Sequence, residues 1–489
     1  MVRGFFCIKN IPLVAGCCVM VRALVGNGSG GVADPRRFCG VVGLDADAAK
    51  NCGNRLGMKV SWIMVVLGRL RKQIDRWLKR IGPGFITGAA DDDPSGVATY
   101  SIAGAQFGYS MLWMSLFLIP PMIAIQEMCG RIGLVTGSGL AGVIKKHYPK
   151  KLLWFAVMLL FVANVINIGA DLGIMASSLQ MLFGLGFYFW LIVTAIFVVF
   201  LIVFVSYNRY SAYLKWFGLT LLVYLVTAFV IKQDWLEIFS SLLIPRIQFN
   251  AGYLMTMIGF MGTTISPYLF FWQASEEVEE EILDKNISDF DQIPTVNKSM
   301  VRNMRRDTNV GMIFSSIIAF FIVITTAATL NKNGIIDIST PQMAAQALRP
   351  LAGDFAYILF AIGIIGIGLQ SIPVLAGSVA YAVSEAMGIK EGLSKKFLEA
   401  KGFYLIISLA TLVGVLMNLL GINTMAALYY TAVINGVIAV PLIYIIIKVA
   451  SDKKIVGEYV TGRGNNAIAW FTFLVMAVSV VLMLGSALI

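Results

Sequence analysis

Two short polar motifs interrupt apolar stretches of the chain. Residues 91–96 read DDDPSG, and residues 262–267 read GTTISP. Carboxylates, hydroxyls and the backbone carbonyls freed at a helix break are hard oxygen donors, and neither motif contains Cys, His or Met. Such donors suit Mg²⁺, Ca²⁺ or Mn²⁺, with water completing the coordination shell. The two motifs therefore predict a site for a hydrated divalent cation.

The three consecutive aspartates of the first motif are not equivalent. On a helix, Asp91 and Asp92 would lie ~200° and ~100° around the axis from Asp93. All three carboxylates therefore cannot face one ion if this turn stays helical. We rank Asp93 first as the ligand, then Asp92 and Asp91, and these two could bind waters of a hydrated ion or raise its local concentration.

The composition places these motifs in a membrane protein. Of 489 residues, 58% are hydrophobic and 13% are charged, about half of the charged fraction usual in soluble proteins. One His, and six Cys without a C-x-x-C pair, indicate neither a His-based metal site nor a zinc site or disulfide framework. No P-loop, cofactor motif or nucleophile constellation is visible, so we predict neither an enzyme nor a cofactor. The excess of 38 Lys and Arg over 27 Asp and Glu fits cytoplasmic loops better than nucleic-acid binding.

The chain divides into three parts. Residues 1–57 show no helical or strand period, and we interpret them as disordered or as an extension from a mis-set start codon, with translation beginning at Met58 or Met64. Residues 58–83 contain the basic string RLRKQIDRWLKR, which predicts an amphipathic segment on the membrane surface. Residues 84–489 form the predicted transmembrane domain.

Eleven apolar segments of this domain are long enough to cross a bilayer. They fall at about residues 84–107, 109–135, 152–184, 187–206, 211–232, 251–282, 308–330, 353–387, 401–420, 424–449 and 466–488. The two motifs interrupt the first and sixth segments, five spans apart, so two five-span units would have opposite orientations. Broken helices at matching positions of inverted halves mark a substrate site at the bilayer midplane. Ordinary proline kinks are the alternative, but a carboxylate at that depth costs at least ~2.5 kcal/mol.

Lys and Arg concentrate in alternate loops. The loops after the second, sixth and tenth spans carry Lys145, Lys146, Arg305, Arg306 and Lys453 among others, whereas the opposite loops carry few basic residues. By the positive-inside rule this predicts a multi-pass protein of the inner (plasma) membrane with a cytoplasmic N-terminus and an external C-terminus.

Local patterns from Gly82 onward resemble the NRAMP family of divalent-metal transporters. The run from Gly82 to Gly96 is similar to the G-P-x-F…D-P-G-N pattern of that family's first span. Further similar positions are Gln126, Gly133, Val135-Thr136-Gly137, Ala170-Asp171-Leu172, residues 262–267 and Gln370-Ser371. The resemblance implies an all-α LeuT-type fold of eleven transmembrane helices, with inverted five-helix repeats, broken helices 1 and 6, and alternating access.

The chain departs from the family pattern at the metal ligands. Gly96 stands where D-P-G-N has its ligand Asn, and in the A-x-x-M-P-H pattern of span six Thr263 replaces Ala and Ser266 replaces the metal-binding Met. A thioether favours Mn²⁺, Fe²⁺ and Cd²⁺ over Mg²⁺ and Ca²⁺, so a hydroxyl there removes this preference. Two small residues also widen the site for an ion that keeps its waters, as Mg²⁺ does. The candidate metal-site residues are Asp93, Thr263, Ser266, Gly96 and Asp92.

The same comparison bears on proton coupling. The family's third span carries Asp and, three residues later, Glu, but here Asp171 is followed by Ile174, and Tyr268 replaces the His of span six. Asn164, Asn167 and Asp171 share one helical face, where interhelical hydrogen bonding is as good an interpretation as a proton route. The pattern resembles the NRAMP-related magnesium transporters, a prokaryotic branch that the resemblance implies carries hydrated Mg²⁺ and Mn²⁺ without proton coupling.

Two other groups of charged residues fit structural interpretations as well as functional ones. Glu127 and Arg131 are spaced i, i+4, which is typical of a helical ion pair. Five glutamates at residues 276–281 follow the inner half of the sixth span. They could draw cations to a cytoplasmic mouth, or they could form a solvated acidic helix end.

Taken together, the residues predict a polytopic transporter or facilitator that moves hydrated Mg²⁺, and also Mn²⁺, into the cell without proton coupling. A proton-coupled Mn²⁺ importer is the alternative within this class. A LeuT-type amino-acid/Na⁺ symporter is the alternative outside it, although three aspartates would repel a substrate carboxylate. The expected partners are the divalent ion and the lipid bilayer, without nucleic acid or cofactor, and we expect a monomer.

Overall fold

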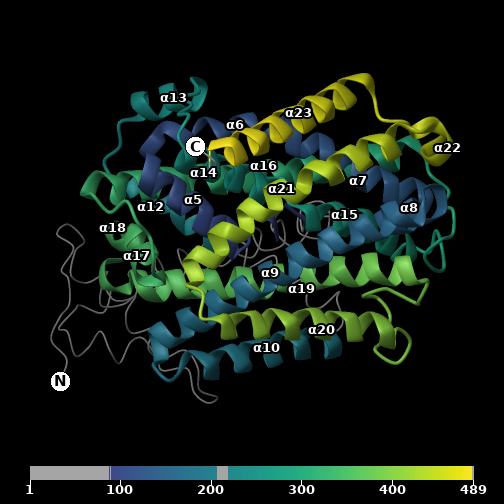
Figure 1. Cartoon of the computed structure of the whole chain (residues 1–489), viewed down its shortest axis with the longest axis horizontal. Helices are drawn as coiled ribbons and strands as arrows, with labels where there is room; N and C mark the ends of the chain where they lie inside the picture. The colour runs from purple at the N-terminus through teal and green to yellow at the C-terminus, as the bar shows by residue number, and fades with distance from the viewer. Residues whose placement is uncertain (1–86, 89, 206–218, 487–489) are drawn as a thin grey trace, which may run out of the picture. The chain divides into compact units, whose positions relative to one another are not determined.

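The computed structural model describes residues 87–88, 90–205 and 219–486, and these residues are almost entirely helical (Figure 1). No strand occurs within these ranges, so the predicted all-α class is confirmed for them. The interpretations of residues 1–57 and 58–83 concern segments outside the described residues.

The helices follow the apolar segments closely. They are α5 (Pro94–Phe107), α6 (Trp113–Phe117), α7 (Ile119–Thr136), α8 (Leu140–His147), α9 (Lys150–Phe183), α10 (Phe187–Phe204), α12 (Leu222–Val230), α13 (Trp235–Leu243), α14 (Ala251–Thr264), α15 (Pro267–Leu283), α16 (Lys298–Thr329), α17 (Pro341–Ala345), α18 (Arg349–Ala352), α19 (Ala356–Met387), α20 (Lys401–Met417), α21 (Thr424–Ser451), α22 (Lys453–Val456) and α23 (Arg463–Ser486). Helix α16 begins ten residues before the predicted span at 308, because its polar first turns continue the same helix beyond the apolar segment.

Nine helical segments of the described ranges are long and apolar enough to cross a membrane. They span residues 113–136, 150–183, 187–204, 251–283, 298–333, 341–387, 401–420, 424–451 and 463–486. Each overlaps one predicted span. The two remaining predicted spans, 84–107 and 211–232, include residues outside the described ranges, so the number eleven stays a prediction.

The two segments that carry the motifs pack against long helices of the bundle. Helix α5 packs against α14, α16 and α21, whereas α15 packs against α7 and α19. A glycine pair allows a close contact between α14 and α21: a Cβ on Gly262 of α14 would lie 2.2 Å from the backbone nitrogen of Gly436 in α21. Because any larger side chain would push these backbones apart, Gly262 fixes the end of α14 against α21.

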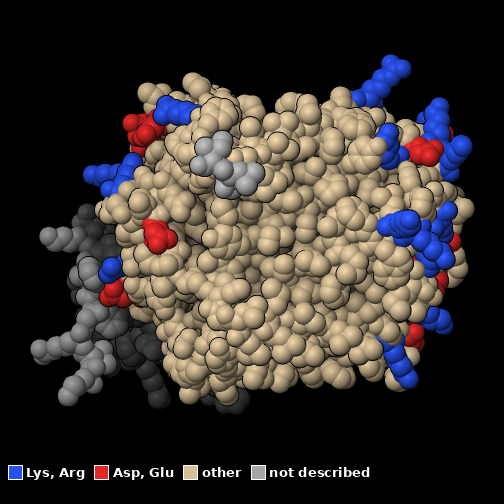
Figure 2. Space-filling view, viewed as in Figure 1, with Lys and Arg blue, Asp and Glu red and all other residues tan. Residues whose placement is uncertain are grey.

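The surface has the charge distribution of a membrane protein. On the face shown in Figure 2, a broad band almost without charged side chains lies between two charged ends, and Lys and Arg gather at the end formed by α8 and α22. Large apolar side chains of α10, α20 and α23, such as Phe197, Leu409 and Leu474, are exposed. An exposed apolar band of this kind is expected where lipid covers the protein.

Candidate metal-binding site

Two helix interruptions produce the predicted motifs. Residues 90–91 are helical, Asp93 has an extended backbone (φ −69°, ψ 171°), and α5 begins at Pro94. In the sixth span, α14 ends at Thr264 and α15 begins at Pro267. Proline at the start of a helix has no N–H to donate and clashes with a preceding helical turn, so each proline separates two helical pieces.

Tyrosine hydroxyls join the two interruptions. The Tyr268 hydroxyl donates to the backbone oxygen of Ala90 at 2.9 Å, and the Tyr100 hydroxyl lies 3.0 Å from Oγ1 of Thr264. Both tyrosines are fully buried. Tyr268 stands at the position of the His in the pattern of span six, and here its side chain holds the backbone of the first interruption.

Oxygen atoms from both motifs surround Gly96. A Cβ on this glycine would lie 3.1 Å from Thr263 Oγ1 and 3.5 Å from both the Asp91 backbone oxygen and Asp93 Oδ1. Thr263 Oγ1 is buried and has no hydrogen-bond partner. The missing side chain of Gly96 therefore lets three oxygens from two broken helices approach one point. Asp93 and Gly96 of the first motif and Thr263 of the second therefore lie together.

The Asp93 carboxylate is held entirely by neutral donors. Its Oδ1 accepts hydrogen bonds from the backbone N–H of Gly96 and the hydroxyl of Ser95, each at 2.7 Å, and its Oδ2 accepts from Asn167 Nδ2 of α9 at 2.9 Å. Asp93 is 1% exposed, and within the described ranges it forms no ion pair with Lys or Arg. The protein thus orients this carboxylate without neutralising it, which suits a cation ligand.

Asp92 points to a different helix. Its Oδ1 lies 3.1 Å from the Ser315 hydroxyl of α16, whereas Asp93 contacts α9 through Asn167. The structure therefore brings Asp93, Gly96 and Thr263 together but gives Asp92 other neighbours. The bend at Asp92 is the cause, since it turns neighbouring carboxylates toward two different helices.

The Ser266 hydroxyl bonds to its own chain. Its Oγ donates toward the carbonyl oxygens of Gly262 and Thr263, at 3.0 and 2.7 Å. The proton of this hydroxyl is therefore used at the end of α14, and only its lone pairs remain for a cation.

The polar face of α9 forms the interhelical hydrogen bonds that the spacing suggested. Asn164 Nδ2 donates to the Leu375 carbonyl and the Ser378 hydroxyl of α19, and the Ser371 hydroxyl donates to Asp171 Oδ2 at 2.9 Å. This interpretation is confirmed. A proton route through Asp171 stays a prediction.

Comparisons with known proteins show the family of this chain. The family described as natural resistance-associated macrophage protein-like, Nramp, matches residues 84–486. The chain belongs to the Nramp family. The divalent metal cation transporter MntH of Mesorhizobium japonicum is 25% identical over 413 residues, covering 81% of this chain and 86% of the relative.

Solved structures share the fold. A manganese transporter of Eremococcus coleocola has a TM-score of 0.64 at 17% identity and covers 82% of this chain and 85% of its own. Mhp1, a nucleobase-cation-symport-1 family transporter, has a TM-score of 0.51 at 10% identity, covering 83% and 92%. The chain therefore has Nramp and LeuT-type structural neighbours. Nramp proteins are transporters of divalent metal cations and not enzymes, as predicted.

Within the part of the chain that the structure describes, the candidate site lacks the residues of a closed metal cage. No group of three His, Cys, Asp or Glu side chains that could hold a metal ion occurs within the described ranges. An ion at Asp93 would therefore take the rest of its shell from Thr263, from backbone carbonyls and from water. Mg²⁺ commonly keeps several waters in this way.

The sequence did not predict that Ser315 contacts Asp91 and Asp92. For Asn167 it predicted interhelical hydrogen bonding, but not the contact with Asp93. The available signal for Ser315 was the adjacent pair Ser315-Ser316 inside an apolar span. For Asn167 it was the shared face with Asp171. Neither signal identifies the partner, because the contacts cross 74 residues to Asp93 and more than 220 residues to Asp91 and Asp92.

The Glu127–Arg131 ion pair of α7 is confirmed, and it is part of a larger network. Arg131 contacts Glu127 Oε1, and Arg305 Nε of α16 lies 2.5 Å from the same oxygen. Asn465 Nδ2 of α23 donates to Glu127 Oε2 at 2.5 Å. Glu127 therefore serves to join α7, α16 and α23.

The glutamates after the sixth span are not a solvated helix end. Four of them are at most 5% exposed: Glu276, Glu277, Glu279 and Glu281. Glu279, for example, accepts hydrogen bonds from the Tyr381 hydroxyl and the Leu393 N–H, both at 2.7 Å. The solvated interpretation is wrong because α15 packs against α19 along this stretch.

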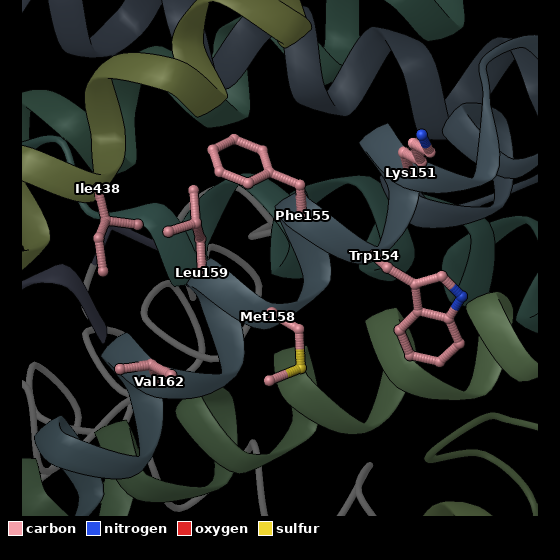
Figure 3. Close-up of a pocket in the computed structure, with 7 residues that line it drawn as sticks. All are labelled: Lys151, Trp154, Phe155, Met158, Leu159, Val162 and Ile438. Carbon is pink, nitrogen blue, oxygen red and sulfur yellow. The ribbon is translucent and has the colours of Figure 1, made fainter.

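A surface hollow of about 520 Å³ lies away from the motifs, along the exposed side of α9 (Figure 3). It is lined by Lys151, Trp154, Phe155, Met158, Leu159, Val162 and Ile438. No carboxylate or hydroxyl lines it, so it offers nothing to a divalent cation. Its apolar side chains fit the lipid-facing surface instead.

Proposed function

We propose that this Nramp chain carries hydrated Mg²⁺, and Mn²⁺ with it, into the cell by alternating access. The observation that carries the proposal is the environment of Asp93. This buried carboxylate is held only by neutral donors, and the Thr263 hydroxyl oxygen and the Asp91 backbone oxygen lie beside Gly96. Oxygen donors favour Mg²⁺ and Mn²⁺ over softer metals.

The small residues of the site support a hydrated ion. Gly96 stands in place of a ligand Asn, and Ser266 stands in place of a ligand Met, so two protein ligands of the family pattern are absent. Water can occupy the coordination positions that they leave. Because Mg²⁺ gives up its waters reluctantly, such a site favours Mg²⁺ over an ion that requires direct ligands. These substitutions support our proposal that the chain belongs to the magnesium-transporting branch of the family.

The membrane potential is sufficient to drive this transport. Two positive charges that cross ~100 mV gain roughly 4.6 kcal/mol, without any coupled ion. Ile174 and Tyr268 replace the titratable residues of the family's proton route. The end of the protein that carries α8 and α22, rich in Lys and Arg, faces the cytoplasm in this proposal, and the protein acts as a monomer.

A proton-coupled Mn²⁺ importer is the second candidate. The observation in its favour is Asp171, which is fully buried and has one carboxylate oxygen, Oδ1, without a hydrogen-bond partner. Similarity to MntH and to a manganese transporter also favours it.

Proteoliposomes distinguish the two candidates. We expect Mg²⁺ uptake that follows a potential set by valinomycin, no acidification of a trapped pH dye, and no accumulation driven by a pH gradient alone. Acidification that accompanies metal entry and disappears in Asp171→Asn would establish the proton-coupled importer and refute the uncoupled one.

A further inference from the structure

The carboxylates of Asp91 and Asp92 meet at one hydroxyl. Ser315 Oγ of α16 lies 2.7 Å from Asp91 Oδ2 and 3.1 Å from Asp92 Oδ1. The two aspartates are 0% and 1% exposed, and Ser315 is 0% exposed. Two adjacent aspartates and a serine more than 220 residues away in the chain therefore form one enclosed polar cluster inside an apolar bundle.

Close backbone packing builds this cluster. A Cβ on Gly88 would lie 2.2 Å from the carbonyl carbon of Gly311, so the segment before Asp91 lies directly against α16. Ser315 follows Gly311 by four residues, which is about one helical turn and places both on the same face. The Tyr268 hydroxyl holds the carbonyl of Ala90 from another direction. The position of the two aspartates opposite Ser315 is thus imposed by the fold.

The cluster lacks positive charge. A serine hydroxyl has one hydrogen, so Ser315 can donate to only one of the two carboxylates. The other two carboxylate oxygens, Asp91 Oδ1 and Asp92 Oδ2, are buried without a hydrogen-bond partner. Within the described ranges, neither aspartate forms an ion pair with Lys or Arg. Two neighbouring buried carboxylates cannot both stay ionised without a counter-charge.

We propose that Asp91, Asp92 and Ser315 form a second divalent-cation site, separate from the site at Asp93. The unpaired oxygens Asp91 Oδ1 and Asp92 Oδ2 are the expected ligands, and the Ser315 oxygen completes the protein part of the shell. Two carboxylates match the charge of one divalent ion. The ion class rests on the proposed function, whereas the site itself rests on the contacts with α16.

Two sites within three consecutive residues would let the protein hold two ions at once. Binding at each is then weakened by the charge of the other ion, which favours release after entry, as in pores with adjacent cation sites. Asp93 keeps its own donors, Gly96, Ser95 and Asn167, in this arrangement.

Counting bound ions tests the second site without relying on transport. Purified full-length protein in nanodiscs is dialysed against radioactive Mn²⁺, and the bound ions are counted. EPR then shows whether two bound Mn²⁺ ions are close, because close Mn²⁺ ions broaden each other's spectrum. We expect two ions per chain, one in Asp93→Asn, and one in the double variant Asp91→Asn/Asp92→Asn. The spectral broadening disappears in both variants.

The serines of α16 provide a conservative pair of variants. Ser315→Ala should weaken the second site at least about tenfold, because it removes a ligand oxygen and the hydroxyl that orients the two carboxylates. Ser316→Ala should leave both ions in place, because this hydroxyl contacts the sulfur of Met122 instead. Thermal melting of each variant verifies folding.

The possible failures are distinguishable. The wild type could bind one ion, which Asp93→Asn loses and the double variant keeps. This result would refute the second site and leave the proposed function intact. One ion that is lost only in the double variant refutes the assignment of Asp93. Two ions that persist in Asp91→Asn/Asp92→Asn show that these carboxylates are neutralised by protons and overturn the proposal.

Discussion

Two buried acidic regions of this protein differ in how their charge is balanced. Glu127 contacts two guanidinium groups, those of Arg131 and Arg305, and the amide of Asn465. Asp93 contacts a hydroxyl, a backbone N–H and the amide of Asn167, and no base within the described ranges.

The difference supports a structural role for Glu127 and the proposed role of Asp93 as a cation ligand. A buried carboxylate costs several kcal/mol unless something compensates it. At Glu127 the fold supplies the compensation and gains a junction of three helices. At Asp93 the fold supplies orientation only, and this supports our proposal that the transported cation compensates the charge of this carboxylate.

Removal of the Asp93 charge should have the largest effect. Asp93→Asn keeps a side chain that can cap α5, since Asn caps helices as well as Asp does. We expect Mg²⁺ uptake into proteoliposomes to fall at least about 100-fold, because the loss of one partner of a buried charge contact costs roughly 3 kcal/mol. The melting temperature should change little. Uptake that persists in well-folded Asp93→Asn protein would refute the site.

Removal of a base from Glu127 should affect stability instead. Arg131→Met leaves the buried carboxylate with one base, Arg305, and the amide of Asn465, and we expect the free energy of unfolding to fall by about 3 kcal/mol. Denaturation with SDS measures this, and uptake per folded molecule should stay within about twofold. Arg302→Met removes an exposed arginine of α16 and should change stability by less than about 0.5 kcal/mol. A specific loss of uptake in stable Arg131→Met protein would contradict the distinction between the regions.

The sequence predicted the fold more fully than the site. Apolar segments long enough to cross a bilayer are a strong signal, and nine of the eleven correspond to long apolar helices. The proline at residue 267 marked the break in the sixth span, because a proline that starts a helix interrupts the one before it. The polar first turns of α16 were not predicted, since span patterns depend on apolar residues alone.

The site was predictable in its ligand types and not in its partners. The Asp93, Gly96 and Thr263 positions followed from the two motifs. Asp93 pairs with Asn167, and Asp92 with Ser315, because particular helices pack together. The spacing of residues within one helix does not show which helices are neighbours. The buried state of Glu279 was missed for the same reason, because its neighbours Tyr381 and Leu393 are about 100 residues away.

Two asparagines offer a matched comparison of the regions. Asn167 donates to Asp93, and Asn465 donates to Glu127. Asn167→Ala should raise the apparent KM for Mg²⁺ about tenfold, because groups that orient a metal ligand usually contribute this much. Asn465→Ala should leave KM unchanged and lower stability by about 1 kcal/mol. Equal effects of the two variants on KM would show that the regions do not differ in function.

The smallest effect is expected from substitutions that change the ion selectivity of the site. These substitutions alter the type of ligand atom and leave the charge of the site unchanged. In this chain Gly96 and Thr263 are complementary: the Thr263 hydroxyl lies 3.1 Å from the place of a Gly96 Cβ, so an Asn at residue 96 needs a smaller residue at 263. The family pattern has that pair, Asn with Ala. We therefore combine Gly96→Asn and Thr263→Ala with Ser266→Met, which supplies the thioether.

The triple variant should shift the ratio of Mg²⁺ to Cd²⁺ uptake several-fold toward Cd²⁺, because a thioether prefers the softer ion. Ser266→Leu in the same background is the matched control, since leucine fills similar space without sulfur. If both variants reduce Mg²⁺ uptake and only the methionine variant gains Cd²⁺, then donor softness selects the ion, while the uncompensated charge of Asp93 only attracts it. A ratio that is equal in the two variants would mean that the width of the site selects the ion instead, and the hydroxyl of Ser266 would lose its role in selectivity.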